Sequence, residues 1–201
     1  MMKKKIFSYL MIVLVIVVSY FYAHIDKNVY LYNRNTDTSI FYTTGILEKN
    51  ENLEQSFHSN ESQIDGINIK VVLVGNVADI KLHCTILDEN NQEVSSTSIL
   101  ASELNSNKFN KIKIPAINNA KGKAYTLVLT EENSDEQNGI GFYVEPKKQS
   151  EQQFFVKGNE VDGTLVTRVI SHRFDVETFV VLLGMLAFIG AFMKVLYKYF
   201  K

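Results

Sequence analysis

Two long apolar segments at opposite ends of the chain place the strongest constraint on its fold. Residues 6–23 carry no charge over 18 positions, and residues 178–197 carry one lysine, Lys194, near their end. A helix of 18 residues is about 27 Å long, close to the thickness of the hydrocarbon core of a bilayer. Lys194 can keep its carbon stem in lipid while its ammonium group reaches the headgroups. We therefore predict a transmembrane helix in each segment.

The placement of charges predicts how these helices are oriented. Six of the 21 basic residues lie at or beyond the outer ends of the two segments: Lys3, Lys4, Lys5, Lys194, Lys198 and Lys201. The other 15 basic residues and all 22 acidic residues lie between His24 and Glu177, which gives that segment a net charge of −7. Because lysine and arginine are retained on the cytoplasmic side, we expect residues 1–5 and 198–201 in the cytoplasm and 24–177 outside.

A cleaved signal peptide is the alternative for the first apolar segment. Such a peptide ends with small residues at positions −1 and −3 of the cleavage site. Ala23 could occupy position −1, but Phe21 would then occupy −3, and no cysteine follows that could carry a lipid. We therefore favour an uncleaved anchor.

The only cysteine, Cys84, excludes a disulfide within the chain. It alternates with Leu82 and Ile86, so we predict a buried, unreactive side chain. An extracytoplasmic domain without disulfides suits the envelope of a Gram-positive bacterium. We therefore expect the plasma membrane of such a bacterium as the location.

The region between the apolar segments has the pattern of an antiparallel β-sandwich. Apolar and polar residues alternate in about ten short runs separated by turn-forming residues, and no sustained helical period occurs. The expected strands are 40–47, 53–58, 67–73, 80–87, 93–100, 109–114, 123–130, 140–145, 153–157 and 164–170. We predict an all-β, jelly-roll-like sandwich at residues 40–176, joined to the first helix by a linker at residues 24–39.

Motifs for catalysis, metals and cofactors are missing from the sequence. The four histidines have no metal-binding spacing, and neither a nucleophile elbow nor a glycine-rich phosphate loop occurs. The near-neutral net charge of −1 argues against nucleic-acid binding. Acidic pairs at residues 88–89 and 135–136 could offer oxygens to calcium, although solvated turns are the favoured interpretation. We predict a non-enzymatic protein without metal or cofactor; a carboxylate pair assembled by folding stays an open alternative.

Two aromatic residues are the candidates for recognition. If Ile140, Phe142 and Val144 face the core, then Tyr143 points outward, and one ring of the pair at residues 154–155 must also leave the core. Exposed rings on sandwich domains can stack on sugars. We therefore predict Tyr143 and Phe155 as glycan or partner contacts, the alternative being that both rings simply cover a sheet face.

The second apolar segment carries a stripe of small residues. Gly184, Ala187 and Ala191 recur at spacings of three and four, which would allow close approach of another helix in lipid. That helix would belong either to residues 6–23 or to another protein, including a second copy of this chain. A chance arrangement of glycine and alanine is the alternative.

Four short segments resemble a known class of domain. They contain a Q-x-F element, an I-D-G-I strand start, a hairpin strand that ends in aspartate, and a G-K-x-Y-x-L strand: residues 53–57, 64–69, 80–88 and 121–127. These motifs are similar to those of the extracytoplasmic jelly-roll domains of bacterial lipoteichoic-acid and polysaccharide glycosylation proteins, over residues 47–170. The resemblance implies the fold and an association with envelope glycans. It does not extend to glycosyl transfer, because the many-helix catalytic portion of those proteins has no counterpart here.

Taken together, these features predict a membrane protein that assists surface-glycan or teichoic-acid assembly by binding either the glycan or a polytopic membrane glycosyltransferase. A chain-length regulator of polysaccharide export would have the same topology, but such regulators carry long ectodomain helices and a proline-rich segment near the second membrane helix. A subunit or sensor of another envelope complex is a further alternative.

Overall fold

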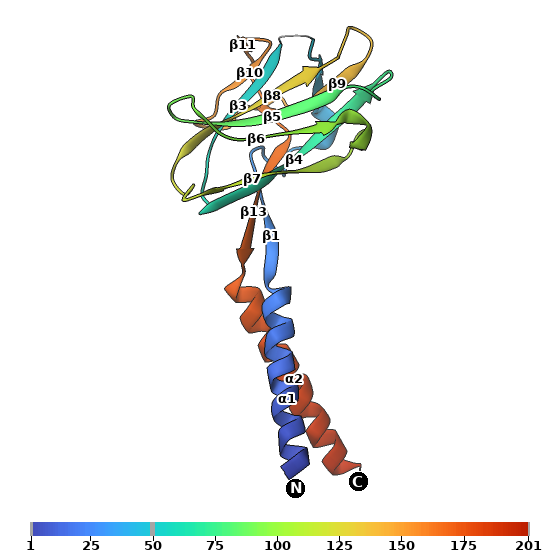
Figure 1. Cartoon of the computed structure of the whole chain (residues 1–201), viewed down its shortest axis with the longest axis vertical. Helices are drawn as coiled ribbons and strands as arrows, with labels where there is room; N and C mark the ends of the chain where they lie inside the picture. Colours follow the sequence, from blue (N-terminus) through green and yellow to red (C-terminus); the bar gives the residue numbers. More distant parts are fainter. Residues whose placement is uncertain (1, 49–50, 201) are drawn as a thin grey trace. The chain divides into compact units, whose positions relative to one another are not determined.

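The structure, a computed structural model, describes residues 2–48 and 51–200 (Figure 1). The chain divides into two units: a helical unit that comprises the residues up to Asp26 and those from His172 on, and a β unit at Lys27–Ser171.

The helical unit contains α1 (Met2–Tyr22) and α2 (Val176–Tyr199). Helix α2 begins where the carboxylate of Asp175 accepts a hydrogen bond from the backbone N–H of Thr178, which satisfies one of the free donors of the first turn. In the described part of the chain, α2 is the helix that is long and apolar enough to span a membrane. The uninterrupted apolar part of α1, Tyr9–Tyr22, is shorter. The structure therefore supports one membrane-spanning helix by length and composition.

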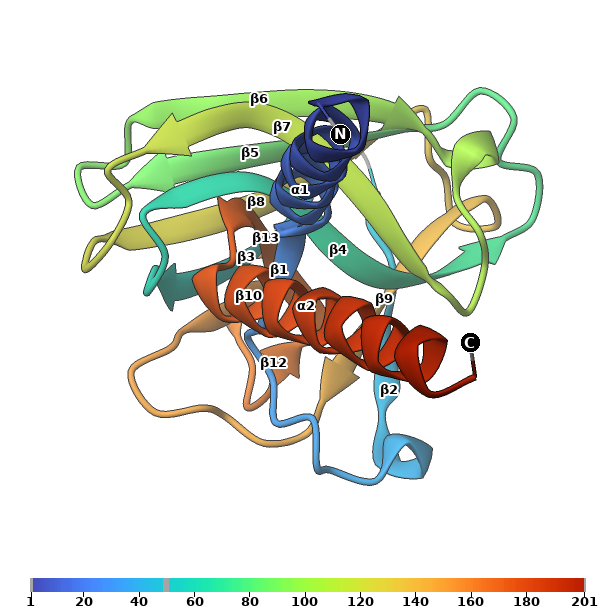
Figure 2. The same cartoon turned by 90° about the horizontal axis from the view of Figure 1, so that it is seen from below.

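The β unit consists of two antiparallel sheets, as expected for a β-sandwich. The seven-stranded sheet contains β1 (His24–Tyr30), β2 (Tyr42–Ile46), β4 (Gln63–Val74), β7 (Phe109–Asn118), β9 (Gly139–Glu145), β12 (Thr164–Leu165) and β13 (Thr167–Phe174). The six-stranded sheet contains β3 (Asn52–His58), β5 (Lys81–Asp88), β6 (Glu93–Leu100), β8 (Ala124–Glu132), β10 (Phe154–Val156) and β11 (Asn159–Glu160). Its strand order is β11-β10-β3-β8-β5-β6, part of which can be followed in Figure 2. Two short 3₁₀ helices occupy Thr38–Ile40 and Ala101–Glu103.

The segment at residues 24–39 differs from the expected linker. Its first seven residues form β1, which lies beside β13 at one edge of the seven-stranded sheet. The sequence of β1, HIDKNVY, lacks an alternating apolar pattern, so its strand character comes from pairing with β13 and is invisible in the sequence alone.

The seven-stranded sheet is forked around β4 and β9. These strands pair with each other at Val71–Val74, and β13 pairs with β4 before that point. Val166 bridges the fork: its N–H donates to the carbonyl of Tyr143 at 2.8 Å, and its carbonyl accepts from the N–H of Lys70 at 3.2 Å. The segment that contains β12 and β13 is thereby held between β9 and β4.

The core lies between the two sheets and is built from alternate residues of their strands. It includes Leu53, Phe57, Ile67, Ile69, Val71, Leu82, Cys84, Ile86, Leu127, Leu129, Ile140, Phe142 and Val144. Cys84 is fully buried as predicted, and burial raises the pKa of its thiol to about 12. The alternation read from the sequence therefore identifies the inner faces of both sheets.

Candidate functional site

The outer face of the seven-stranded sheet is set by the alternation along β9. Ile140, Phe142 and Val144 are fully buried against the core, so Tyr143 and Gly141 face away from it. In register with Tyr143 is Thr43 of β2, and in register with Gly141 is Val72 of β4. Three strands thus contribute to one outward surface.

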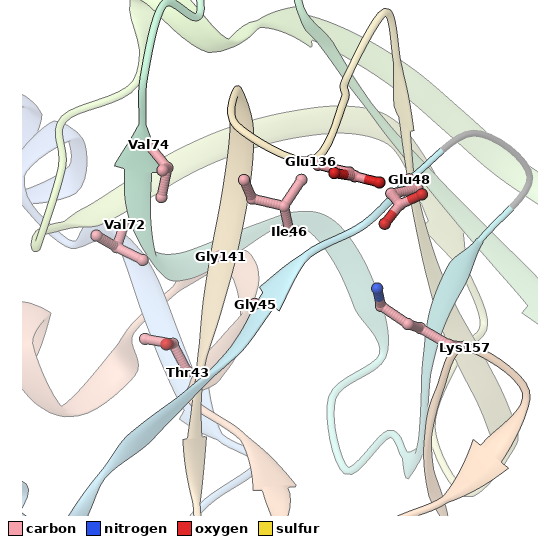
Figure 3. A pocket seen from close by; sticks show the side chains of 9 residues that line it. All are labelled: Thr43, Gly45, Ile46, Glu48, Val72, Val74, Glu136, Gly141 and Lys157. Carbon is pink, nitrogen blue, oxygen red and sulfur yellow. The ribbon is translucent and has the colours of Figure 1, made fainter.

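A hollow of about 420 Å³ lies over this surface, and we call it the outer groove (Figure 3). It is lined by Thr43, Gly45, Ile46, Glu48, Val72, Val74, Glu136, Gly141 and Lys157. Gly141 lies tightly under Val72, because a Cβ atom there would lie 2.7 Å from Cγ1 of Val72 and would displace that side chain. Gly45 has a positive φ of 77°, a conformation in which side chains are strained.

The charged residues of the outer groove gather at one end. Figure 3 shows the carboxylates of Glu48 and Glu136 near each other, with the side chain of Lys157 pointing towards them. Lys157 also forms an ion pair with Glu51, with 2.7 Å between Nζ and Oε2. This end therefore offers both hydrogen-bond acceptors and a cation to a ligand.

A buried carboxylate supports the strands that form the groove. Glu131 belongs to β8 of the other sheet, and its side chain accepts hydrogen bonds from the backbone N–H groups of Leu47 and Ile140, at 3.2 and 2.9 Å. Burial raises the pKa of the Glu131 carboxyl to about 7, although these hydrogen bonds and the charge of Lys157 oppose the rise. The protonation of Glu131 therefore changes near neutral pH.

Tyr143 lies beside the outer groove with its ring half-buried. Its hydroxyl donates to Oδ1 of Asn107 at 2.6 Å, and Nζ of Lys70 lies 4.4 Å from the centroid of its ring. The ring is thereby held in one orientation on the outer face. The recognition role of Tyr143 stays a prediction.

A second aromatic group on the same sheet surrounds Arg168 of β13. The guanidinium carbon of Arg168 lies 3.6 Å from the ring centroid of Phe109 and 4.6 Å from that of Tyr30. Arg34 also approaches the Tyr30 ring, at 5.7 Å. Sequence reasoning missed this cluster because its members lie far apart in the chain and meet only through the pairing of β1, β13, β4 and β7.

Phe155 lies on the other sheet and is not brought together with Tyr143. Phe154 is buried in the core, whereas Phe155 of β10 is half-buried and in register with Glu54 and Glu160. One ring of the pair therefore leaves the core, as the sequence pattern required. The two predicted contact residues do not form a single site.

The small-residue stripe of α2 is exposed within the helical unit. A Cβ atom added at Gly184 or Gly190 would meet nothing within 4 Å. Ala187 and Gly190 line an apolar hollow of about 530 Å³ together with residues of α1, including Met11 and Val15. Gly184 thus makes no close backbone contact with α1, and association through Gly184, Ala187 and Ala191 stays a prediction.

Within residues 2–48 and 51–200, no group of three or more histidine, cysteine, aspartate or glutamate side chains is arranged to hold a metal ion. No family model, curated protein or solved structure significantly matches the chain.

Proposed function

We propose that the chain is a non-enzymatic, membrane-anchored β-sandwich protein of the bacterial cell envelope that assists surface-glycan or teichoic-acid assembly by binding a glycan. The observation that carries this proposal is the outer groove. Gly141 and the side chain of Val72 that packs over it form its base, which we call the glycine floor, and the ring of Tyr143 is held in one orientation beside it. The jelly-roll resemblance read from the sequence favours the same class of ligand.

The chemistry of the outer groove suits a sugar chain. A sugar presents apolar C–H faces and hydroxyl groups, so it needs a flat ring to stack on and polar groups at the rim. Tyr143 supplies the ring, Asn107 supplies an amide beside it, and Glu48 and Glu136 supply acceptors for hydroxyl groups. The side chain of Val72 packs over Gly141, so the apolar part of the groove is formed by Val72, Val74 and Ile46.

Binding experiments on the full chain in lipid nanodiscs test this proposal. We expect the wild-type protein to retain one or more glycans from a panel of bacterial surface polysaccharides. Tyr143→Ala removes the stacking ring and is expected to weaken binding at least tenfold. Thr85→Ala, on the outer face of the six-stranded sheet, is the matched control and is expected to bind as the wild type does. If no glycan is retained, or if Tyr143→Ala binds normally, the proposal is wrong.

The proposed topology has both α1 and α2 in the membrane and both termini in the cytoplasm. The grouping of six lysines at the outer ends of the two apolar segments supports it. Cysteine labelling in intact cells tests it with low background, because Cys84 is fully buried. We expect a membrane-impermeant maleimide to label Ser98→Cys in intact cells and Lys198→Cys only after permeabilisation. Labelling of Lys198→Cys in intact cells would contradict the topology.

Two other assignments share this topology. Chain-length regulators carry long ectodomain helices, whereas the described part of the β unit contains strands and two 3₁₀ turns, which argues against such a regulator. A role as a subunit or sensor of another envelope complex would depend on a protein partner. The exposed stripe at Gly184, Ala187 and Ala191 would then contact a polytopic glycosyltransferase or a second copy, and crosslinking from a photoreactive residue at position 184 would identify it.

Glycoside hydrolysis is the alternative from a different class, and the observation that favours it is the presence of Glu48 and Glu136 in one groove. We expect no release of reducing ends from any glycan that binds. We also expect Glu48→Gln and Glu136→Gln to change the affinity for the glycan and to have no effect on the release of reducing ends. Sugar release that disappears in either variant would assign the groove to an enzyme.

A further inference from the structure

We infer that the ligand of the outer face is an anionic glycan, whose phosphate or carboxylate groups bind Arg168 and Lys70 while its uncharged sugar units occupy the outer groove. This inference rests on the proposed glycan-binding function and specifies the charge of the ligand and the direction in which it lies.

The surroundings of Arg168 indicate an anion site. Its guanidinium group packs against the rings of Phe109 and Tyr30, which hold it in place, and its buried Nε has no hydrogen-bond partner among the described residues. A planar guanidinium held in this way matches the two oxygens of a carboxylate or phosphate. In the described part of the chain, no carboxylate lies within ion-pair distance of Arg168, so its charge is not neutralised by the protein.

Lys70 provides a second cation on the same surface. Arg168 is in register with Asn68, and Lys70 follows Asn68 by two residues on the same face of β4. Such diagonal neighbours lie about 7–8 Å apart, so one linear ligand can reach both. Lys70 contacts the ring of Tyr143, and no ion pair of Lys70 occurs among the described residues. The two cations therefore lie in line with the proposed stacking ring.

The distribution of charge along the face gives the ligand a direction. The route runs from Arg168 through Lys70 and Tyr143 to the outer groove, where Glu48 and Glu136 gather at the far end. Lys157 at that end is paired with Glu51, so among the described residues Glu48 and Glu136 leave this end with excess negative charge, which repels anionic groups. Their carboxylates accept hydrogen bonds from hydroxyl groups. The segment between His24 and Glu177 has a net charge of −7, so attraction of an anion is a local property of this face.

Matched pairs of glycans test the inference on the full chain in nanodiscs of zwitterionic lipid. Each pair consists of an acidic oligosaccharide and the same oligosaccharide with its carboxylates methyl-esterified or its phosphates removed. We expect the acidic member to bind at least tenfold more tightly, and high salt to reduce that difference because it screens exposed charges. Equal binding of both members would overturn the inference and leave the proposed function standing. Binding of neither member, across the panel, would overturn both.

Charge variants locate the anionic groups. Arg168→Gln is expected to lose at least tenfold in affinity for the acidic member and to leave the neutral member unchanged. Arg168→Lys keeps the charge without the planar fork and should fall between Arg168→Gln and the wild type. Lys70→Gln is a second variant with the same expected direction, useful if Arg168→Gln unfolds. The control is Lys81→Gln on the six-stranded sheet, where Lys81 is paired with Glu132. Normal binding by both Arg168→Gln and Lys70→Gln would overturn the inference.

A lipid headgroup is the other source of such anions. We expect vesicles that contain phosphatidylglycerol to compete no better than vesicles of phosphatidylcholine. Competition by the anionic vesicles that is lost in Arg168→Gln would overturn the inference and assign the two cations to the membrane surface.

Discussion

The outer faces of the two sheets differ although both sheets follow the same alternation. On the six-stranded sheet, most outward residues are polar, and the apolar ones include Val128 and Phe155. The polar ones include Glu54, Ser56, His83, Thr85, Ser96, Ser98, Thr126 and Thr130. On the seven-stranded sheet, they include the rings of Tyr30, Phe109 and Tyr143, the cations Lys70 and Arg168, and the glycine floor of the outer groove.

The difference between the two faces indicates that one is suited to contact with water and that the other has the features of a recognition surface. Short hydroxylated side chains interact with water as well as with any ligand, so they keep a sheet face solvated. Aromatic rings that are half-buried and held by neighbouring cations have lost much of their side-chain freedom before a ligand arrives, which lowers the entropic cost of binding. The same fold thus presents one mainly polar face and one face that carries rings, cations and a groove.

The assignment of residues to the inner and outer faces of the sheet is tested most directly at two adjacent residues of β9. Phe142→Ala removes a fully buried ring from the core and is expected to lower the free energy of unfolding by about 3–5 kcal/mol. Tyr143→Ala removes a half-buried ring and is expected to cost about 1 kcal/mol. Urea unfolding of the detergent-solubilised full chain, followed by tyrosine fluorescence, measures both. A loss of similar size in the two variants would refute the assignment of the two faces.

The dependence of stability on pH tests the contact that Glu131 of the six-stranded sheet makes with backbone N–H groups of the other sheet. Because the pKa of Glu131 is raised from 4.5 to about 7 in the folded protein, the folded state holds this proton more tightly than the unfolded state. The stabilising effect of this bound proton is complete below pH 4.5 and is lost as pH rises through 7. The free energy of unfolding then decreases by about 3 kcal/mol. We expect Glu131→Gln to flatten the profile in this range. Glu103→Gln, at an exposed carboxylate, is the control and should keep the slope.

The glycine floor is tested by adding one methyl group. Gly141→Ala places a Cβ atom 2.7 Å from Cγ1 of Val72 and is expected to cost about 1–2 kcal/mol in stability. It also narrows the outer groove, so glycan affinity should fall. The double variant Gly141→Ala with Val72→Ala should regain stability, because the contact is removed. If the single variant is as stable as the wild type, the floor is less tightly packed than the structure indicates.

The smallest effect is expected on the mainly polar face. Thr85→Ala should change the free energy of unfolding by less than about 0.5 kcal/mol and leave glycan binding unaltered. Thermal unfolding and nanodisc binding measure the two quantities. A clear loss of glycan affinity in this variant would place recognition on the six-stranded sheet instead.

Local alternation determined the inner faces of the sheets from the sequence alone. Apolar residues at every second position predicted the burial of Cys84 and of the three inward residues of β9, and hence the outward position of Tyr143. This works because side chains of a strand alternate between two faces whatever the strand pairs with. Lengths of strands were less accessible: the expected strand at 109–114 continues through Pro115 to Asn118, where β4 and β7 shift register near Gly66.

The residues that meet in the folded protein were set by the pairing of distant strands. The outer groove combines Gly45 with Gly141, the cation cluster combines Tyr30, Phe109 and Arg168, and Glu131 reaches from one sheet to strands of the other. These contacts depend on strand order and register, which long-range pairing sets and which no local pattern records. Local patterns in the chain were enough to predict the apolar ends, the β class and the two faces of the strands. The site and its charge followed from pairing between distant segments, because a sheet brings together residues that the chain keeps apart.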